Sequence, residues 1–310
     1  MVLPRVEGGY GVRLVSVSDM PRDRLAGVRR RALEPHIVGS AIGASAGHPL
    51  GGTRLLLAID VGNSNLTIGV FRDQGLLAHG RFATRRDATP DELGLQVLSF
   101  LQQRGFPTEI GSVAVSCVVP TLNQALVEMA HTYLGVEPMM VGPGTRTGME
   151  IHYDPPRDVG ADRIATAVGV RHRYGGPAVM VSFGTATVFD AIDARGNYLG
   201  GAIAPGLQLS VDALFSRAAR LPRVDLVAPD RVLGRTTVSS MQAGIMYGAA
   251  AQAEGLIKRI RGEIGEAARV VATGGLSPLV APLVDGVDVI DPLVLLEGLR
   301  VLEEMNRPRA

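Results

Sequence analysis

The sequence predicts an α/β protein built from two related halves. A strand, a glycine-containing turn and a second strand occur in LLLAIDVGNSNLTIGVF, residues 55–71, and again in AVMVSFGTATVFDAID, residues 178–193. In both copies a third apolar strand follows, and then segments with helical spacing. A chain of 310 residues, of which 46% are hydrophobic, is long enough for about two domains. We therefore expect an internal duplication in which a three-strand meander opens each half.

Composition argues against several classes of protein. The net charge is +1, from 31 basic and 30 acidic residues, so no nucleic-acid partner is expected. No apolar run approaches the ~18–20 residues of a membrane-spanning helix. Cys117 is the single cysteine, which excludes an intrachain disulfide and a cysteine-based zinc site and favours a reducing, cytoplasmic environment. Lys258 is the single lysine, so a nucleotide would be bound without the lysine of a Walker-type loop.

Three regions are predicted along the chain. Residues 1–52 are rich in Arg and Gly and have no sustained hydrophobic period, so we expect an N-terminal extension that is disordered or results from a mis-assigned start codon. Residues 53–158 are predicted as the first domain and residues 159–310 as the second.

The first half reads as a meander followed by alternating helices and strands. Residues 89–105 open with Thr-Pro-Asp-Glu, a helix N-terminus signal, and continue with helical spacing, and residues 121–135 are the next expected helix. Strands are expected over residues 54–60, 66–71, 76–82, 112–120 and 138–142.

The second half repeats this order. After the two strands of residues 178–193 we expect a third strand over residues 197–206, two helices over residues 207–221 and 239–265, and a strand that begins at Ala268. That strand meets a Gly-Gly pair, and Ser277-Pro278 then suits a helix start.

The two glycine turns are the strongest sign of a ligand site. Asp60-Val61-Gly62-Asn63-Ser64-Asn65 parallels Ser182-Phe183-Gly184-Thr185-Ala186-Thr187. Consecutive backbone N–H groups in a tight turn form an anion-binding concavity, and glycine lets the backbone approach a ligand. One such turn alone is better explained as a hairpin. Two copies at matched positions favour a polyphosphate held between the halves, with Asp60 holding a hydrated Mg²⁺.

A second acid lies in YDPPRDVGADRIATAVG, residues 153–169. Asp162 follows Gly160 where a helical pattern opens. An acid there is also ordinary N-terminal capping, and spacing alone leaves both interpretations open. In the functional interpretation Asp162 is a general base that accepts a hydroxyl proton during phosphoryl transfer. Arg163 would then hold an anionic group of the acceptor.

Three further motifs have both a functional and a purely structural interpretation. The histidines do not have the spacing of metal ligands. TGGLSP, residues 273–278, and GGAIAPG, residues 200–206, would admit a ligand close to the backbone or serve only as packed turns. In LGRTTVSSMQAG, residues 233–244, Thr236 or Thr237 would be a ligand contact or a helix cap.

The motifs DVGNSN, GADRIATAVG, FGTAT, GGAIAPG, MQAGIMYG and ATGG occur together and in this order. In this combination the sequence resembles the type III pantothenate kinases of the acetate and sugar kinase/Hsp70/actin superfamily, from about Thr53 onward. The resemblance implies two duplicated ribonuclease H-like/actin-like ATPase domains with a nucleotide cleft between them. It also implies a cytoplasmic homodimer that phosphorylates pantothenate with ATP to 4′-phosphopantothenate in coenzyme A synthesis, using a divalent cation and K⁺ or NH₄⁺.

The resemblance also assigns site residues. It makes Asp162 the proton acceptor, and Asp60 the residue that holds the divalent cation through water. The residues it places on ATP are Asp60, Val61, Gly62, Asn63, Ser64, Asn65, Leu66, Thr67 and Thr185. Those it places on pantothenate are Tyr153, Gly160, Ala161, Asp162, Arg163 (through the carboxylate) and Thr237, which would reach the site of the other subunit.

One departure from the family pattern concerns K⁺. Ser182 stands where the family has an aspartate that binds the monovalent cation, and Val188 replaces a usual threonine. A neutral hydroxyl supplies no charge, and nothing in the sequence shows that Asp190 on the following strand compensates. We therefore expect retained kinase activity with altered or absent K⁺ dependence.

Two other functions stay open, because a fold does not fix a substrate. One is a kinase for another small hydroxyl substrate, which a panel of acceptors would identify. The other is a catalytically weak or inactive nucleotide-binding regulator, which would bind ATP without turnover and would suit Ser182. The apolar stretch Met241–Leu256 could supply the two-fold interface of a homodimer.

Overall fold

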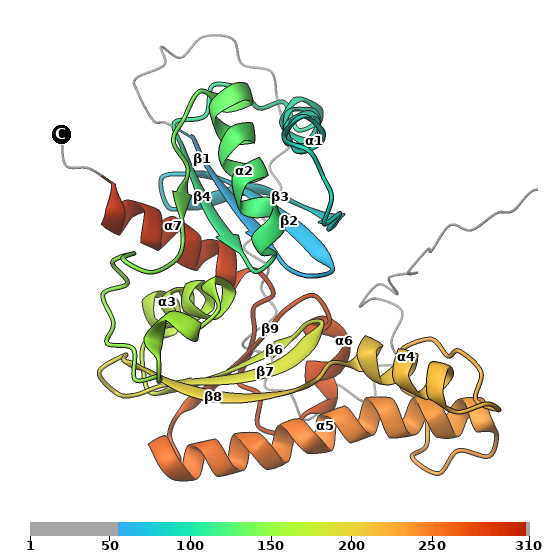
Figure 1. Cartoon of the computed structure of the whole chain (residues 1–310). Helices are drawn as coiled ribbons and strands as arrows, with labels where there is room; N and C mark the ends of the chain where they lie inside the picture. The colour runs from blue at the N-terminus through green and yellow to red at the C-terminus, as the bar shows by residue number, and fades with distance from the viewer. Residues whose placement is uncertain (1–54, 308–310) are drawn as a thin grey trace, which may run out of the picture. The chain divides into compact units, whose positions relative to one another are not determined.

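The computed structural model describes residues 55–307, which form two five-stranded mixed sheets with their helices (Figure 1). The predicted extension, residues 1–52, lies outside the described residues. All the elements described belong to one compact unit. None of the helices within residues 55–307 is both long and apolar enough to span a membrane.

The first sheet has the strand order β3-β2-β1-β4-β5, in which β1 to β3 are an antiparallel meander and β4 and β5 run parallel to β1. Its strands are β1 (Leu55–Val61), β2 (Asn65–Arg72), β3 (Gly75–Ala83), β4 (Ser112–Cys117) and β5 (Met139–Met140). Helices α1 (Pro90–Gln103) and α2 (Asn123–Met129) cover one face through alternate apolar residues of β1 and β2. Thr89 and Glu92 form a capping box at α1, as its sequence signal predicts.

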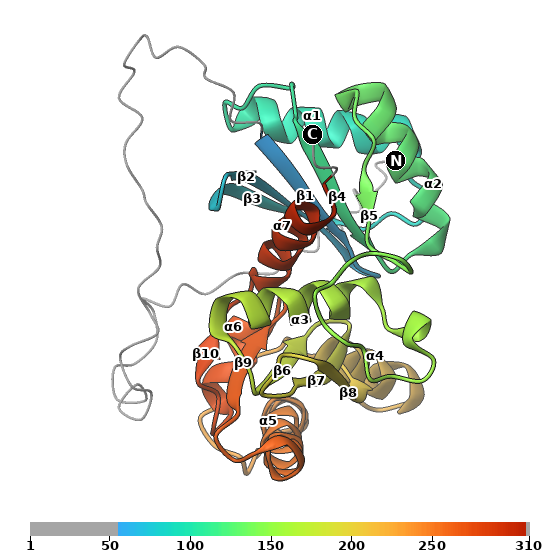
Figure 2. The ribbon, with the colours of Figure 1, turned by 90° about the vertical axis from the view of Figure 1, so that its left-hand side faces the viewer.

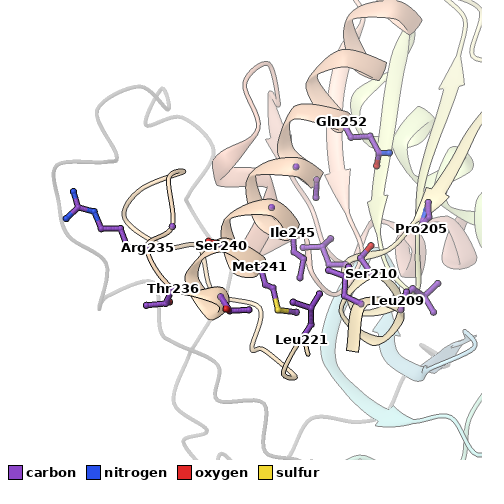
Figure 3. A pocket seen from close by; sticks show the side chains of 18 residues that line it. Pro205, Leu209, Ser210, Leu221, Arg235, Thr236, Ser240, Met241, Ile245 and Gln252 are labelled. Carbon is purple, nitrogen blue, oxygen red and sulfur yellow. The ribbon is translucent and has the colours of Figure 1, made fainter. Parts of the chain in front are cut away.

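The second sheet has the order β10-β9-β6-β7-β8, which is the order of the first sheet read from the other end. Its strands are β6 (Ala178–Phe183), β7 (Ala186–Ile192), β8 (Tyr198–Pro205), β9 (Arg269–Thr273) and β10 (Val289–Ile290). Its helices are α4 (Leu207–Arg217), α5 (Thr237–Ile264) and the short α6 (Ser277–Val280). A cavity of about 1150 Å³ lies between α4 and α5 (Figure 3). The repeated topology confirms the predicted duplication and the α/β, actin-like fold class.

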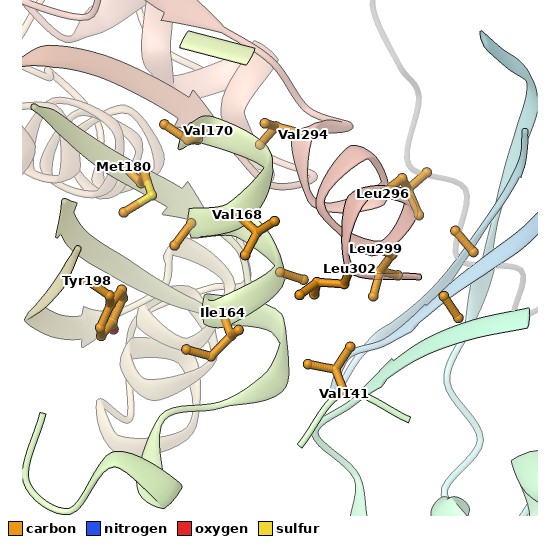
Figure 4. Packing of buried hydrophobic residues seen from close by; sticks show 14 of the residues in the cluster. Val141, Ile164, Val168, Val170, Met180, Tyr198, Val294, Leu296, Leu299 and Leu302 are labelled. Carbon is orange, nitrogen blue, oxygen red and sulfur yellow. The ribbon is translucent and has the colours of Figure 1, made fainter. Parts of the chain in front are cut away.

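Two helices, α3 (Ala161–Tyr174) and α7 (Val294–Asn306), pack side by side between the sheets (Figure 2). Ile164 and Val168 of α3 belong to one buried cluster with Leu299 and Leu302 of α7, and this cluster also includes residues of β1 and β6 (Figure 4). This cluster therefore joins the two halves of the protein and fixes α3 relative to both sheets.

The two helices approach each other closely because glycines face each other's backbone. A Cβ on Gly298 would overlap the carbonyl oxygen of Ala165, and a Cβ on Gly169 would overlap the carbonyl oxygen of Val294. Only glycine at both positions allows this separation, since protein interiors have no spare volume for an added methyl group.

The sequence analysis named most elements but not all. The predicted helix of residues 207–221 ends at Arg217, and neither β10 nor α7 was anticipated. The helix expected over residues 121–135 is α2 between a 3₁₀ turn at Pro120–Leu122 and a π turn at Ala130–Leu134. The boundary between residues 158 and 159 stays a prediction. Helix α7, from the end of the chain, packs against β1 and β4 of the first sheet.

Gly298→Ala is expected to destabilise the protein by about 1–3 kcal/mol, because the new methyl group forces α3 and α7 apart. Gly262→Ala is the matched control, since Gly262 lies on exposed α5 with open space around its Cα, and it should stabilise by about 0.5–1 kcal/mol. Urea denaturation gives both free energies of unfolding. A Gly298→Ala protein as stable as the wild type would contradict the tight crossing.

Candidate active site

The first glycine turn, between β1 and β2, is closed by its own backbone and supported by a neighbouring segment. The N–H of Gly62 donates to the carbonyl oxygen of Asn65 (2.9 Å). Thr84, just after β3, donates its hydroxyl to the carbonyl of Gly62 (2.7 Å) and its N–H to that of Ser64 (3.1 Å). The turn is therefore held in one conformation from outside.

The second turn, between β6 and β7, is built alike but is one residue shorter. Strand pairing resumes at Val61–Leu66 in the first turn and at Phe183–Thr187 in the second. The tips of the two turns meet, because the hydroxyls of Ser64 and Thr185 lie 2.9 Å apart. The structure thus brings the two predicted phosphate loops together across the halves.

Asp60, the acid near the end of β1 before the first turn, has one carboxylate oxygen that is buried without a hydrogen-bond partner. Its Oδ1 is shielded from solvent and accepts no hydrogen bond from the described residues, and the hydroxyl of Ser116 on β4 is equally unpaired. Burial raises the pKa of Asp60 to about 7, and the charge of Asp162 adds to this effect, while the nearby Ser116 hydroxyl lowers it. Asp60 and Asp162 therefore share one electrostatic environment.

Asp162 is the second residue of α3, and α3 follows an extended Gly160. Its Oδ1 accepts the backbone N–H of Arg163 (2.8 Å), so the capping role considered for this acid is partly realised. Burial nevertheless raises the pKa of Asp162, and Asp190 raises it further. A carboxylate with a raised pKa is a stronger base than a solvated one, so capping and proton transfer are compatible here.

Arg163 is buried and already holds an anion of this chain. Its Nε lies 3.1 and 3.2 Å from the two carboxylate oxygens of Asp190, and its Nη2 lies 2.6 Å from Oδ1. Tyr198 donates its hydroxyl to the same Oδ1 (2.8 Å). The rings of Tyr153 and Tyr198 lie 5.4 and 5.8 Å from the guanidinium carbon. Arg163 is therefore held in one orientation beside Asp162.

Tyr153 lies next to Arg163 because the segment before α3 runs along β8. The N–H of His152 donates to the carbonyl oxygen of Tyr198 (2.8 Å). Gly200, with φ of +92°, leaves room for the ring, since a Cβ there would lie 3.1 Å from Cδ2 of Tyr153. This glycine of the GGAIAPG motif thus packs against a side chain of the site.

The Gly-Gly pair after β9 packs on the second turn. The N–H of Leu276 donates to the carbonyl oxygen of Phe183 (3.0 Å). Gly274, with φ of +86°, lies so close that a Cβ would stand 2.6 Å from that same oxygen. The backbone of TGGLSP therefore packs on the end of β6, directly before Gly184.

The donor groups present fit only one kind of metal site. No group of three or more His, Cys, Asp or Glu residues suited to a metal ion occurs in the part of the chain that the structure describes. Asp60, with an unpaired oxygen, and Asp162 match a hydrated Mg²⁺ whose remaining ligands are water and phosphate. For K⁺ the carboxylate is missing, because Ser182 is neutral and Asp190 is paired with Arg163.

Thr237 is the one predicted site residue that lies apart. It is the exposed first residue of α5 and lines the cavity between α4 and α5. The cap of this helix is Thr236, whose hydroxyl accepts the N–H of Ser239 (3.1 Å). Among the hydrogen bonds of residues 55–307, none joins Thr237 to α3.

Some residues of the site were missed at the level of sequence. They are Arg81, Thr84, Ser116 and Tyr198, together with the pairing of Asp190. Strand alternation offered a signal for two of them, because Ser116 and Arg81 lie in the same row across the first sheet as Asp60.

Comparisons with known proteins identify the family. A family model described as type III pantothenate kinase matches residues 56–259. A protein of Moorella thermoacetica described as a type III pantothenate kinase is 53% identical over 253 residues, which are 81% of this chain and 100% of that protein. One from Listeria monocytogenes serotype 4a with the same description is 45% identical over 255 residues, 82% of this chain and 98% of its own.

A solved structure supports the fold alone. The structure of a conserved putative Baf family transcriptional activator from Campylobacter jejuni is 20% identical, with a TM-score of 0.51. The match covers 81% of this chain and 98% of that one.

Stability should depend on pH through Asp60. The carboxyl ionises near 3.8 when solvated and at about 7 in the folded protein. Between these values the folded state binds the extra proton, so its stability falls as pH rises and the whole cost is present above about pH 7. Asp60→Asn removes this cost.

In metal-free buffer, the free energy of unfolding of Asp60→Asn relative to wild type should therefore rise by about 2–4 kcal/mol from about pH 5 to about pH 8. Asp158→Asn, at an exposed acid before α3, serves as the control and should show no such rise. A difference for Asp60→Asn that is independent of pH would contradict the shifted ionisation.

Proposed function

Because the chain belongs to the type III pantothenate kinase family, we propose that it transfers the γ-phosphoryl group of ATP to the hydroxyl of pantothenate, giving 4′-phosphopantothenate and ADP, a step of coenzyme A biosynthesis. The observation that carries the proposal is the placement of Asp162. The charge of this base acts on Asp60, which lies near the end of β1, the strand that leads into the first of two glycine turns whose tips meet.

The proposed chemistry divides between the two halves. The turn of Asp60 to Thr67 and the hydroxyl of Thr185 hold the phosphates through N–H and O–H donors. The hydroxyl oxygen of pantothenate attacks the γ-phosphorus, the bond from that phosphorus to the ADP oxygen breaks, and the hydroxyl proton passes to the carboxylate of Asp162. A divalent cation, held by Asp60 through water, supplies neutralisation of the phosphate charge.

The acceptor is proposed to lie on the α3 side of the site. Tyr153 and the Gly160–Arg163 segment surround Asp162, and Arg163 presents its guanidinium to the carboxylate of pantothenate. Arg163 already shares its charge with Asp190, so it offers a fixed hydrogen-bonding geometry more than an unpaired charge. The orientation of the acceptor hydroxyl toward Asp162 follows from this rigidity.

Activity without K⁺ is part of the proposal. Ser182 supplies no carboxylate at the second turn, and both oxygens of Asp190 accept hydrogen bonds from Arg163. We therefore propose a kinase whose dependence on K⁺ is altered or absent.

A second candidate function is a nucleotide-binding regulator with little catalysis. The neutral Ser182 favours it, and a putative transcriptional activator shares the fold, although at 20% identity. A third is phosphorylation of another small hydroxyl compound. The intact Asp60 and Asp162 favour the kinase over the regulator.

A homodimer through α4 and α5 completes the proposal. The cavity between these helices is lined by Leu209, Leu214 and Met241, and Leu209 is 46% exposed. Gly244 and Gly248 on α5 have open space around them, which a second helix would fill. Thr237 lies at this surface, where it would reach the acceptor site of the other subunit.

Asp162→Asn should lower pantothenate-dependent ADP release by about 10²–10⁴-fold, because the variant cannot accept the hydroxyl proton. Asp158→Asn, an exposed neighbour, should keep wild-type turnover. The assay contains ATP, Mg²⁺ and pantothenate, with and without K⁺. K⁺ should have no effect on the wild type. It should raise the turnover of Ser182→Asp, in which the carboxylate is restored. ATP binding without turnover of pantothenate or of other acceptors would favour the regulator instead.

Sedimentation velocity should give about twice the chain mass of 32.6 kDa. Gly244→Glu should shift the protein to monomer, because it places a charge in the middle of the proposed interface. Gly262→Glu, on the same helix outside the cavity, is the control and should stay dimeric. A wild-type monomer at all protein concentrations would refute the interface.

A further inference from the structure

Arg81 lies in one row with the predicted nucleotide residues of the first sheet. Asp60 pairs with Thr67 on β2, and Thr67 pairs with Arg81 on β3. Directly opposed residues of neighbouring antiparallel strands point to the same face of the sheet. Arg81 therefore shares the face of Asp60, two strands away, at a Cα separation of about 10 Å.

The side chain of Arg81 reaches across to the second half of the protein. Its guanidinium lies against Gly275, so closely that a Cβ there would collide with it. Gly275 follows Gly274, whose backbone packs on Phe183 at the second turn. The guanidinium thus lies beside the Gly-Gly loop, which packs on the residue before the second glycine turn.

Arg81 has no anion of its own within residues 55–307. It makes no ion pair and no hydrogen bond there, and partial burial lowers its pKa without a carboxylate to oppose the shift. An arginine still stays charged at neutral pH. Its neighbours differ, because Arg163 is paired with Asp190 and Arg86 donates to Asn63 (2.9 Å). Arg81 is an exposed residue, so a ligand anion can reach its guanidinium from solvent.

We propose that Arg81 is a phosphate-binding residue for ATP, supplying from β3 the cation that a Walker lysine supplies elsewhere. The inference rests on the proposed function and extends it. A guanidinium can bind two phosphate oxygens at once. The acceptor's carboxylate is a poorer match, because the acceptor hydroxyl must lie at Asp162 at the start of α3, whereas Arg81 lies on β3.

The test compares Arg81→Gln, Arg81→Lys and wild type. Arg72→Gln is the matched control, since Arg72 is an exposed arginine at the far end of the same meander. Calorimetric titration gives the Kd of ATP, and ligand-observed NMR gives the Kd of adenosine, which has no phosphate. Arg81→Gln should weaken ATP binding by about tenfold or more and leave adenosine binding unchanged. Arg81→Lys should fall between, and Arg72→Gln should match wild type.

Kinetics and stability complete the comparison. Arg81→Gln should raise the KM for ATP while the KM for pantothenate and the unfolding midpoint of the free protein stay at wild-type values. An unchanged Kd for ATP, or an equal loss for ATP and adenosine, would overturn the assignment. A wild type that binds ATP tightly but phosphorylates no pantothenate would refute the proposed function and still leave the Arg81 comparison decisive.

Discussion

The contact between α3 and α7 at Gly169 and Gly298 is the constraint on which the site depends. Helix α3 carries Asp162 and Arg163 at its start, and α7 packs on the first sheet, which carries Asp60. The distance between the two acids is therefore set by how closely two helix backbones approach. A side chain on a rigid helix is positioned more accurately than one on a loop. Here α3 is held rigidly because Gly169 and Gly298 let it pack closely against α7.

The site concentrates negative charge and neutralises only part of it. Asp190 is paired with Arg163 and Tyr198, whereas the pKa values of Asp60 and Asp162 are raised because burial disfavours their charged forms. Packing of three hydrophobic clusters must offset this cost in the free protein. The divalent cation that we propose to bind through Asp60 would relieve this cost.

Strand alternation and glycine turns made the meanders, both turns and Asp162 predictable, because these signals are local in sequence. Helix α7 was not predicted, although its apolar residues recur with helical spacing. The pairing of Arg163 with Asp190 depends on how α3 docks against β7, and no local pattern encodes that docking. Arg81 was not predicted either, because an irregularity in the β2–β3 pairing at Val70 and Phe71 shifts its register, and its contact with Gly275 joins the two halves.

The two halves share a topology but differ in the residues that lie at the end of their leading strands. The first retains an acid at the end of its leading strand, Asp60, and the second has Ser182 and a turn that is one residue shorter. The nearest acid on the following strand, Asp190, holds the buried guanidinium of Arg163, whose charge would otherwise be left unpaired at a prohibitive cost. Asp190 therefore cannot serve both Arg163 and a monovalent cation. The second turn therefore has no free carboxylate at this position, and its N–H and hydroxyl groups suit the binding of phosphate oxygens.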